Sequence, residues 1–163
     1  SALAKSYGGV PYYVETVDPT DMALYKDRDS YLYIAQKILE DFQNALENVR
    51  VDDTKRQVNR YVVGAYMSRE LLYHATWLKY HGSTVGPDAE KIADEDIKSL
   101  LQGAINGANV VIGSNKYSIG NTYNALFTTD DLADNKEVIW YREYTSGLQG
   151  NALMSYNLSL IHI

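Results

Sequence analysis

This sequence contains no cysteine among its 163 residues and few basic side chains. Without cysteine, disulfide bonds, thiolate zinc sites and a cysteine nucleophile are excluded within these residues. No apolar run approaches the ~20 residues that a helix needs to cross a bilayer. The 15 Lys and Arg residues stand against 21 Asp and Glu residues, which gives a net charge of −6. Because the basic residues form no stripe that could neutralise a phosphate backbone, nucleic acid is not an expected partner.

Phenylalanine and tryptophan are also scarce, with 2 residues each, whereas tyrosine is abundant, with 15. A tyrosine ring packs against apolar surface while its hydroxyl group seeks a polar partner. This combination suits half-exposed surfaces and binding sites better than dry cores. The composition therefore indicates extensive contact surfaces.

Three stretches carry apolar residues at helical spacing between capping or turn residues. They predict helices over 31–49, 58–82 and 87–112, the first two forming an antiparallel pair. The tail of a further helix is expected over 1–9, where two consecutive glycines end it. The expected apolar face of the second helix contains Val58, Tyr61, Val62, Ala65, Arg69, Leu72, Ala75 and Leu78.

Small residues within these helices predict close helix packing. Gly103 and Gly107 are four residues apart, and each glycine costs about 1 kcal/mol in an exposed helix interior. Close approach of a partner helix would offset that cost, so the two glycines are expected to mark a crossing point. Ala65 and Ala75 would allow a similar approach on the second helix.

Residues 137–144 (EVIWYREY) are the best strand candidate, and residues 123–127 are expected to form a helical turn. Long polar or glycine-rich loops join the remaining segments. The predicted fold class is all-α, with tetratricopeptide-like antiparallel helix pairs, one short strand segment and long loops.

Four segments then occur in a familiar order: YGGVP at 7–11, RELLYHATWLKYHG at 69–82, YNALF at 123–127 and NKEVIW at 135–140. Their order and spacing resemble the SusD/RagB-like family of Bacteroidota. Proteins of that family are lipid-anchored on the outer face of the outer membrane. Their tetratricopeptide-type helices lie beside a TonB-dependent transporter, and the proteins capture oligosaccharides, or in some members peptides, for import.

The resemblance implies that residues 1–157 are a central fragment of such a protein, without its lipobox cysteine, first helices and long C-terminal region. Residues 158–163 (LSLIHI) have a separate explanation. They are the translation of CTG-TCT-CTT-ATA-CAC-ATC, a run found in a common transposase sequencing adapter, and we interpret them as non-native. The expected location of the full-length protein is the surface-facing side of the outer membrane.

Residues 140–144 and the loop that follows them carry the side-chain types that hold sugars. Flat aromatic faces stack on the apolar faces of pyranose rings, while amides, carboxylates and arginine bind hydroxyl groups. Strand alternation would place Trp140, Arg142 and Tyr144 on one face. The candidate ligand-binding residues are Tyr144, Asn151, Tyr156, Arg142 and Trp140.

Packing competes with binding at each tryptophan. For Trp140, packing of the predicted strand on the helices is favoured over ligand contact, because large aromatic residues dominate cores. Trp77 and Tyr80 on the second helix are expected to pack between helices. The loop candidates are therefore preferred over the tryptophans as ligand contacts.

Catalytic and metal chemistry find no support in the sequence. His74 and His81 are seven residues apart and lack the HExxH spacing, so a structural histidine is expected and no metal site or cofactor is predicted. Glycoside hydrolysis needs two carboxylates across the scissile bond, but the aspartate pairs occur at helix starts and in loops, where capping explains them. These pairs are Asp27/Asp29, Asp52/Asp53, Asp94/Asp96 and Asp130/Asp131.

Two functions remain in view. The first is non-catalytic capture of oligosaccharides for import through a TonB-dependent transporter partner. The second is a tetratricopeptide-like module that binds a protein or peptide, since paired helices rich in tyrosine serve that role as well. A glycosidase is a distant third hypothesis.

Overall fold

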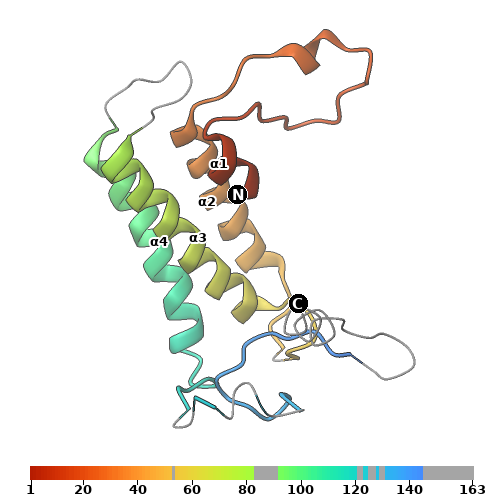
Figure 1. Cartoon of the computed structure of the whole chain (residues 1–163), viewed down its shortest axis with the longest axis vertical. Helices are drawn as coiled ribbons and strands as arrows, with labels where there is room; N and C mark the ends of the chain where they lie inside the picture. Colours follow the sequence, from red (N-terminus) through yellow and green to blue (C-terminus); the bar gives the residue numbers. More distant parts are fainter. Residues whose placement is uncertain (53, 83–91, 121–122, 125–127, 129–130, 145–163) are drawn as a thin grey trace, which may run out of the picture.

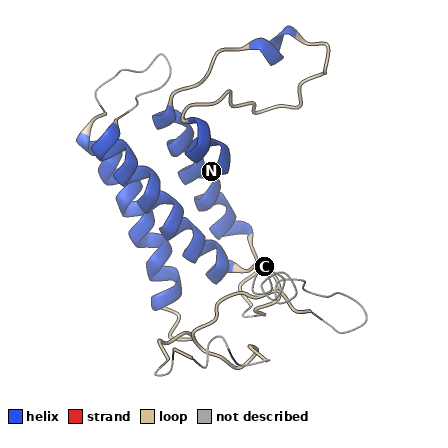
Figure 2. Ribbon diagram, in the orientation of Figure 1, coloured by secondary structure: helices blue, strands red, loops and turns tan. Residues whose placement is uncertain are grey.

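The computed structural model describes residues 1–52, 54–82, 92–120, 123–124, 128 and 131–144. Its elements, in chain order, are α1 (Ala2–Tyr7), the short 3-10 helix η1 (Met22–Tyr25), α2 (Tyr31–Asn48), α3 (Arg60–His81) and α4 (Asp94–Ile112). The helices α2, α3 and α4 run alternately down, up and down, with α3 in the middle (Figure 1). The described part of the chain contains no strand (Figure 2), which confirms the all-α fold class.

Local capping explains where the helices begin and end. The Ser30 hydroxyl oxygen accepts a hydrogen bond from the Tyr33 backbone N–H at 2.9 Å, so α2 begins at the predicted position. The helix α3 ends at Gly82, whose φ of +64° lies in the left-handed region that favours glycine. The expected helix tail over 1–9 is confirmed by α1, which ends before Gly8.

The predicted start of the third helix was wrong. Ile92 and Ala93 are not helical, and α4 begins only at Asp94. The residues at 94–96 are all acidic, so their carboxylates lie in the first turn, at the positive end of the helix dipole. This electrostatic preference places the helix start at the acidic residues rather than at the proline upstream.

The hydrophobic core lies around α3, which packs against both neighbouring long helices. Met67, Leu71 and Leu78 are fully buried, whereas Leu72 is 50% exposed and Arg69 is exposed. The predicted apolar face was therefore wrong at these last two positions, and also at Val58, which precedes α3 and is 50% exposed. A helix that is covered from two sides buries a wide surface, and a single narrow stripe cannot describe it.

The glycines of α4 lie at its crossing with α3, as predicted. A Cβ atom on Gly107 would lie 2.7 Å from the Gly64 carbonyl oxygen and 2.8 Å from the Ser68 backbone nitrogen. A Cβ atom on Gly103 would lie 2.7 Å from a methyl carbon of Leu71 on α3 and 2.6 Å from one of Leu39 on α2. The two helices therefore approach backbone to backbone, and larger residues would force them apart.

The predicted strand at 137–144 was wrong, because these residues form loops and turns. Their one long-range backbone hydrogen bond to another described residue runs from the Tyr141 N–H to the Lys55 carbonyl, at 3.1 Å. An alternating aromatic pattern suits a pleated sheet, but a strand needs a neighbouring strand to form a ladder. No such neighbour exists among the residues that the structure describes. The helical turn predicted over 123–127 lies mostly outside the described residues.

Candidate functional site

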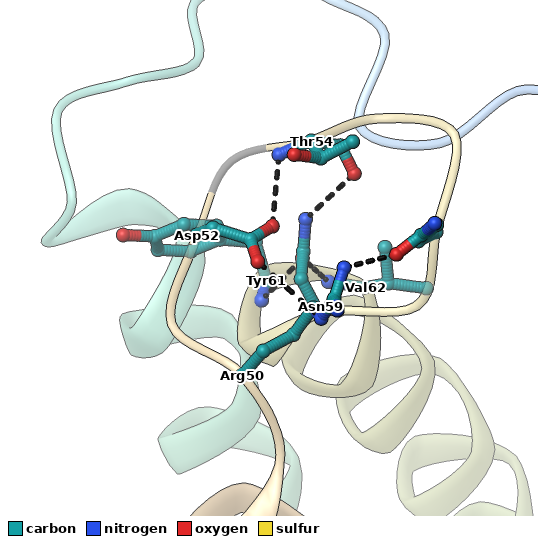
Figure 3. Close-up of polar contacts among 7 residues, drawn as sticks. Arg50, Asp52, Thr54, Asn59, Tyr61 and Val62 are labelled. Carbon is teal, nitrogen blue, oxygen red and sulfur yellow. Dashed lines mark hydrogen bonds and ion pairs between the residues drawn. The ribbon is translucent and has the colours of Figure 1, made fainter.

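The loop between α2 and α3 is held by a network around Asn59 (Figure 3). The buried Asn59 side chain accepts hydrogen bonds from the backbone N–H groups of Tyr61 and Val62, at 3.0 and 3.1 Å. It also donates to the Thr54 carbonyl at 3.3 Å. The Thr54 N–H in turn donates to the Asp52 carboxylate at 3.1 Å. The same side chain therefore caps α3 and holds the loop in its conformation.

The same loop anchors the segment that contains Trp140. The Lys55 ammonium donates hydrogen bonds to the carbonyl oxygens of Ala133 and Asn135, at 2.7 and 2.6 Å. Arg56 forms an ion pair with Glu143 at 3.0 Å and donates to the Tyr141 hydroxyl at 3.3 Å. These contacts bring residues more than 75 positions apart in sequence together at the N-terminal end of α3.

Trp140 and Tyr66 border a groove on the surface of α3. Their rings meet edge to face, with centroids 6.3 Å apart, and the residues are 45% and 43% exposed. The groove has a volume of about 380 Å³. We call it the aromatic groove; it is lined by Val62, Ala65, Tyr66, Arg69, Glu137, Val138, Ile139 and Trp140.

Trp140 also borders two further hollows. One, of about 530 Å³, lies towards α1 and α2 and is mainly apolar, with Phe42, Val58 and Val63 in its lining. The other, of about 650 Å³, is lined by Arg56, Trp140, Tyr141, Arg142 and Glu143, and we call it the arginine hollow. The Trp140 indole is therefore the point at which three concave surfaces meet.

Some charged side chains of the aromatic groove and the arginine hollow already have hydrogen-bond or ion-pair partners, and others do not. The Glu137 carboxylate accepts a hydrogen bond from the Gly120 N–H at 2.8 Å, and Glu143 is paired with Arg56. Arg142 lies over the Tyr144 ring, 5.4 Å from its centroid, and has no ion pair with any described residue. Arg69 likewise forms no ion pair or hydrogen bond within the described ranges. With respect to the described residues, two guanidinium groups are thus open to a ligand.

Three of the five predicted site residues can be placed. Trp140 and Arg142 line the arginine hollow together, and Tyr144 joins them through its contact with Arg142. Tyr141 lines the same hollow, so the alternation expected from a strand was wrong. Packing was favoured for Trp140, and its ring does meet the Tyr66 ring edge to face. Nearly half of the residue is nevertheless exposed, so packing does not account for its whole surface. Asn151 and Tyr156 lie outside the described residues.

Sequence reasoning missed Tyr66 and Arg69 as groove residues. Val62, Ala65, Tyr66 and Arg69 follow an i, i+3, i+4, i+7 pattern and therefore share one face of α3. The usable signal was Arg69 itself, the charged residue among the otherwise apolar or aromatic positions of the predicted helix face. Such a residue on a face with an aromatic neighbour indicates a groove more readily than a core.

Trp77 and Tyr80 were wrongly predicted to pack between helices. Trp77 is 39% exposed and Tyr80 is 73% exposed. Trp77 stacks between Tyr73 and His81 of the same helix, with centroid distances of 6.0 and 4.4 Å. Both faces of its ring are thus partly covered by neighbours from α3, which makes it a poorer sugar platform than Trp140.

His74 is a structural residue, as predicted. It is fully buried, and its Nδ1 atom lies 2.8 Å from the Tyr31 hydroxyl oxygen. Its Nε2 atom lies 3.2 Å from the Ser1 hydroxyl oxygen. Burial lowers the pKa of His74 from its usual 6.5 to about 4. The imidazole is therefore neutral at physiological pH.

The carboxylate next to this histidine has a partner as well. Glu70 forms an ion pair with Lys5 at 2.7 Å and a hydrogen bond with the Ser1 hydroxyl group, which ties α1 to α3. The pKa of Glu70 is lowered, because its bonds to Lys5 and Ser1 outweigh the opposing effect of burial. Within the described part of the chain, no cluster of three or more His, Asp or Glu side chains could hold a metal ion, and no helix is long and apolar enough to span a membrane.

Comparisons of the chain with protein families, with characterised proteins and with solved structures found no match.

Proposed function

We propose that this chain captures oligosaccharides without hydrolysing them, and that the aromatic groove and the arginine hollow form the capture surface. The observation that carries the proposal is Trp140. This residue is 45% exposed, borders three hollows and shares the lining of the aromatic groove with the charged residues Arg69 and Glu137. Aromatic faces of this kind stack on pyranose rings, and planar polar groups beside them bind the hydroxyl groups.

The firm anchoring of the Trp140 segment supports a binding role. Lys55 holds the backbone of the segment at two carbonyl oxygens, and Tyr141 returns a backbone hydrogen bond to Lys55. A platform that is held in place before the ligand arrives loses less conformational entropy on binding.

A non-catalytic role is supported by the state of the carboxylates. Glu137 and Glu143 are the acidic residues of the aromatic groove and the arginine hollow, and each is already engaged by an N–H donor or an arginine. Hydrolysis of a glycoside requires one carboxyl group as an acid and another as a base or nucleophile. Neither carboxylate can take one of these roles without giving up the contact that it already makes.

The motif order that resembles the SusD/RagB-like family extends the proposal to the cell surface. In that setting the full-length protein is lipid-anchored on the outer membrane and delivers its ligand to a TonB-dependent transporter. Recovery of the complete reading frame tests this part. An upstream lipobox cysteine and a neighbouring transporter gene are expected, and their absence would argue for the tetratricopeptide-like peptide-binding module instead.

Affinity electrophoresis against a panel of polysaccharides tests the binding itself. Retardation of the protein by at least one polysaccharide, with no release of reducing sugars, is expected. Retardation by none of them, together with binding to a peptide library, would replace oligosaccharide capture with peptide binding. Release of oligosaccharide products by the purified protein would contradict the non-catalytic role.

A further inference from the structure

We infer that the ligand of this surface is an acidic oligosaccharide, whose carboxylate groups are bound by Arg69 and Arg142. The inference rests on the proposed function, because it names the ligand class of the same surface. It starts from the charges that line the aromatic groove and the arginine hollow, both of which Trp140 borders.

The local charge is opposite in sign to that of the whole chain. Three arginines and two glutamates line the two concave surfaces, a formal local charge of +1, whereas the protein carries −6. The three arginines are Arg56, Arg69 and Arg142. A neutral sugar does not require a cationic surface, but an anionic sugar would be repelled by an acidic one.

The pairing of these groups strengthens the argument. Both glutamates have partners, since Glu137 accepts the Gly120 N–H and Glu143 pairs with Arg56. Arg69 and Arg142 have no carboxylate partner within the described ranges. Apart from the Arg56–Glu143 pair, the surface therefore carries two guanidinium groups and the Glu137 carboxylate, which accepts a neutral donor, so its net charge remains positive.

The guanidinium group also indicates which anion would bind. Its planar pair of N–H donors matches the two oxygens of a carboxylate in a bidentate arrangement. Arg142 is held over the Tyr144 ring, 5.4 Å from the centroid, which limits the orientations of its side chain. An oligosaccharide of uronic acids would stack one ring on Trp140 and place carboxylates towards both arginines.

Matched pairs of ligands separate charge from shape. Oligogalacturonate, oligomannuronate and a glucuronate-containing oligosaccharide would each be titrated into the protein by calorimetry, alongside their methyl esters. The esters keep the sugar rings and remove the charge. At least one acid is expected to bind about tenfold more tightly than its ester, and this ratio should fall as salt is added.

Variants assign the preference to the two arginines. The double variant Arg69→Gln and Arg142→Gln should bring the ratio between acid and ester close to one, because the affinity for the acid should fall further than the affinity for the ester. Lys98→Gln is the matched control, because it removes one positive charge from the exposed face of α4, where Lys98 pairs with Glu95. This control should retain the preference for the acid.

The outcomes distinguish this inference from the proposed function. Binding of neutral oligosaccharides with no preference for any acid would overturn the inference and leave oligosaccharide capture intact. A preference that survives in the double variant would also overturn it. Tighter binding of a sulfated oligosaccharide than of its desulfated form, with no response to the uronate pairs, would replace carboxylate by sulfate. Absence of binding to acidic, neutral and sulfated oligosaccharides alike would contradict the proposed function itself.

Discussion

Gly64 of α3 and Gly107 of α4 lie backbone against backbone, so that a Cβ atom on either residue would come within 3 Å of the other's carbonyl oxygen. This crossing sets the distance between the central helix and α4. It also positions the α3 face from which Tyr66 and Arg69 project into the aromatic groove.

Gly107→Ala should destabilise the protein, because the new methyl group would meet backbone atoms that cannot move independently. Overpacking of this kind typically costs about 1–3 kcal/mol. Thermal or urea denaturation followed by circular dichroism measures the change. Asn109→Ala is the control, because Asn109 is exposed and lies two residues after Gly107 on α4. This change should alter stability by less than about 0.5 kcal/mol. Equal stability of the Gly107 variant and wild type would contradict the close crossing.

Asn59→Ala should also destabilise the protein, because two buried N–H groups of α3 would lose their acceptor. The expected loss is about 1–2 kcal/mol, the usual cost of removing a helix cap. Asn59→Asp keeps the acceptor and loses only the bond to the Thr54 carbonyl, so it should retain most of the stability. If the two variants were equally unstable, capping would not be the function of this side chain.

The buried His74 predicts a loss of stability in mild acid. Its pKa is about 4 in the folded protein and 6.5 in an unfolded chain, so the unfolded state binds the proton first as the pH falls. The stabilisation is complete above pH 6.5 and is lost progressively between pH 6.5 and 4, with about 2 kcal/mol lost between pH 7 and 5. Urea denaturation at several pH values measures this slope.

His74→Gln should flatten that slope between pH 7 and 5. Glu70 also has a lowered pKa, but its contribution is lost only as the pH falls below the usual carboxyl value of 4.5. The pH range in which His74 affects stability therefore lies above the range in which Glu70 does. An unchanged slope above pH 5 in the variant would show that another group causes the acid sensitivity.

Lys55→Met should loosen the Trp140 segment, because it removes the ammonium group that bonds to Ala133 and Asn135. Methionine keeps a similar apolar stem. Acrylamide quenching of Trp140 fluorescence, measured in a Trp77→Phe background, should increase in the variant. Unchanged quenching would mean that the segment is held without Lys55.

The sequence predicted the fold more successfully than the site because helix periodicity is a local signal. The ranges 31–49 and 58–82 agree closely with α2 and α3, and the packing role of Gly103 and Gly107 followed from their position inside a helix. The strand at 137–144 failed for a non-local reason. Its alternation was genuine, but whether a partner strand exists cannot be deduced from the segment alone.

The groove was only half predictable for the same reason. Trp140 and Arg142 attracted attention through their residue types. Their neighbour Tyr66 comes from a helix more than 70 positions earlier, and it is brought near by the bonds of Lys55 and Arg56 to the later segment. No sequence pattern within either segment predicts the contact between Tyr66 and Trp140. Trp77 shows the opposite error, since its helical position indicated packing although the residue is exposed on α3.

The central claim is that the aromatic groove captures the ligand. The most direct test is calorimetric titration of the wild type, Trp140→Ala and Trp77→Ala with an oligosaccharide from a polysaccharide that retards the protein in affinity electrophoresis. Both tryptophans are partly exposed, but only Trp140 borders the aromatic groove. Trp140→Ala should weaken binding at least about tenfold, the loss of one stacked aromatic ring, while Trp77→Ala should bind like the wild type. Unchanged affinity in Trp140→Ala, or an equal loss in both variants, would contradict the assignment of ligand capture to this groove.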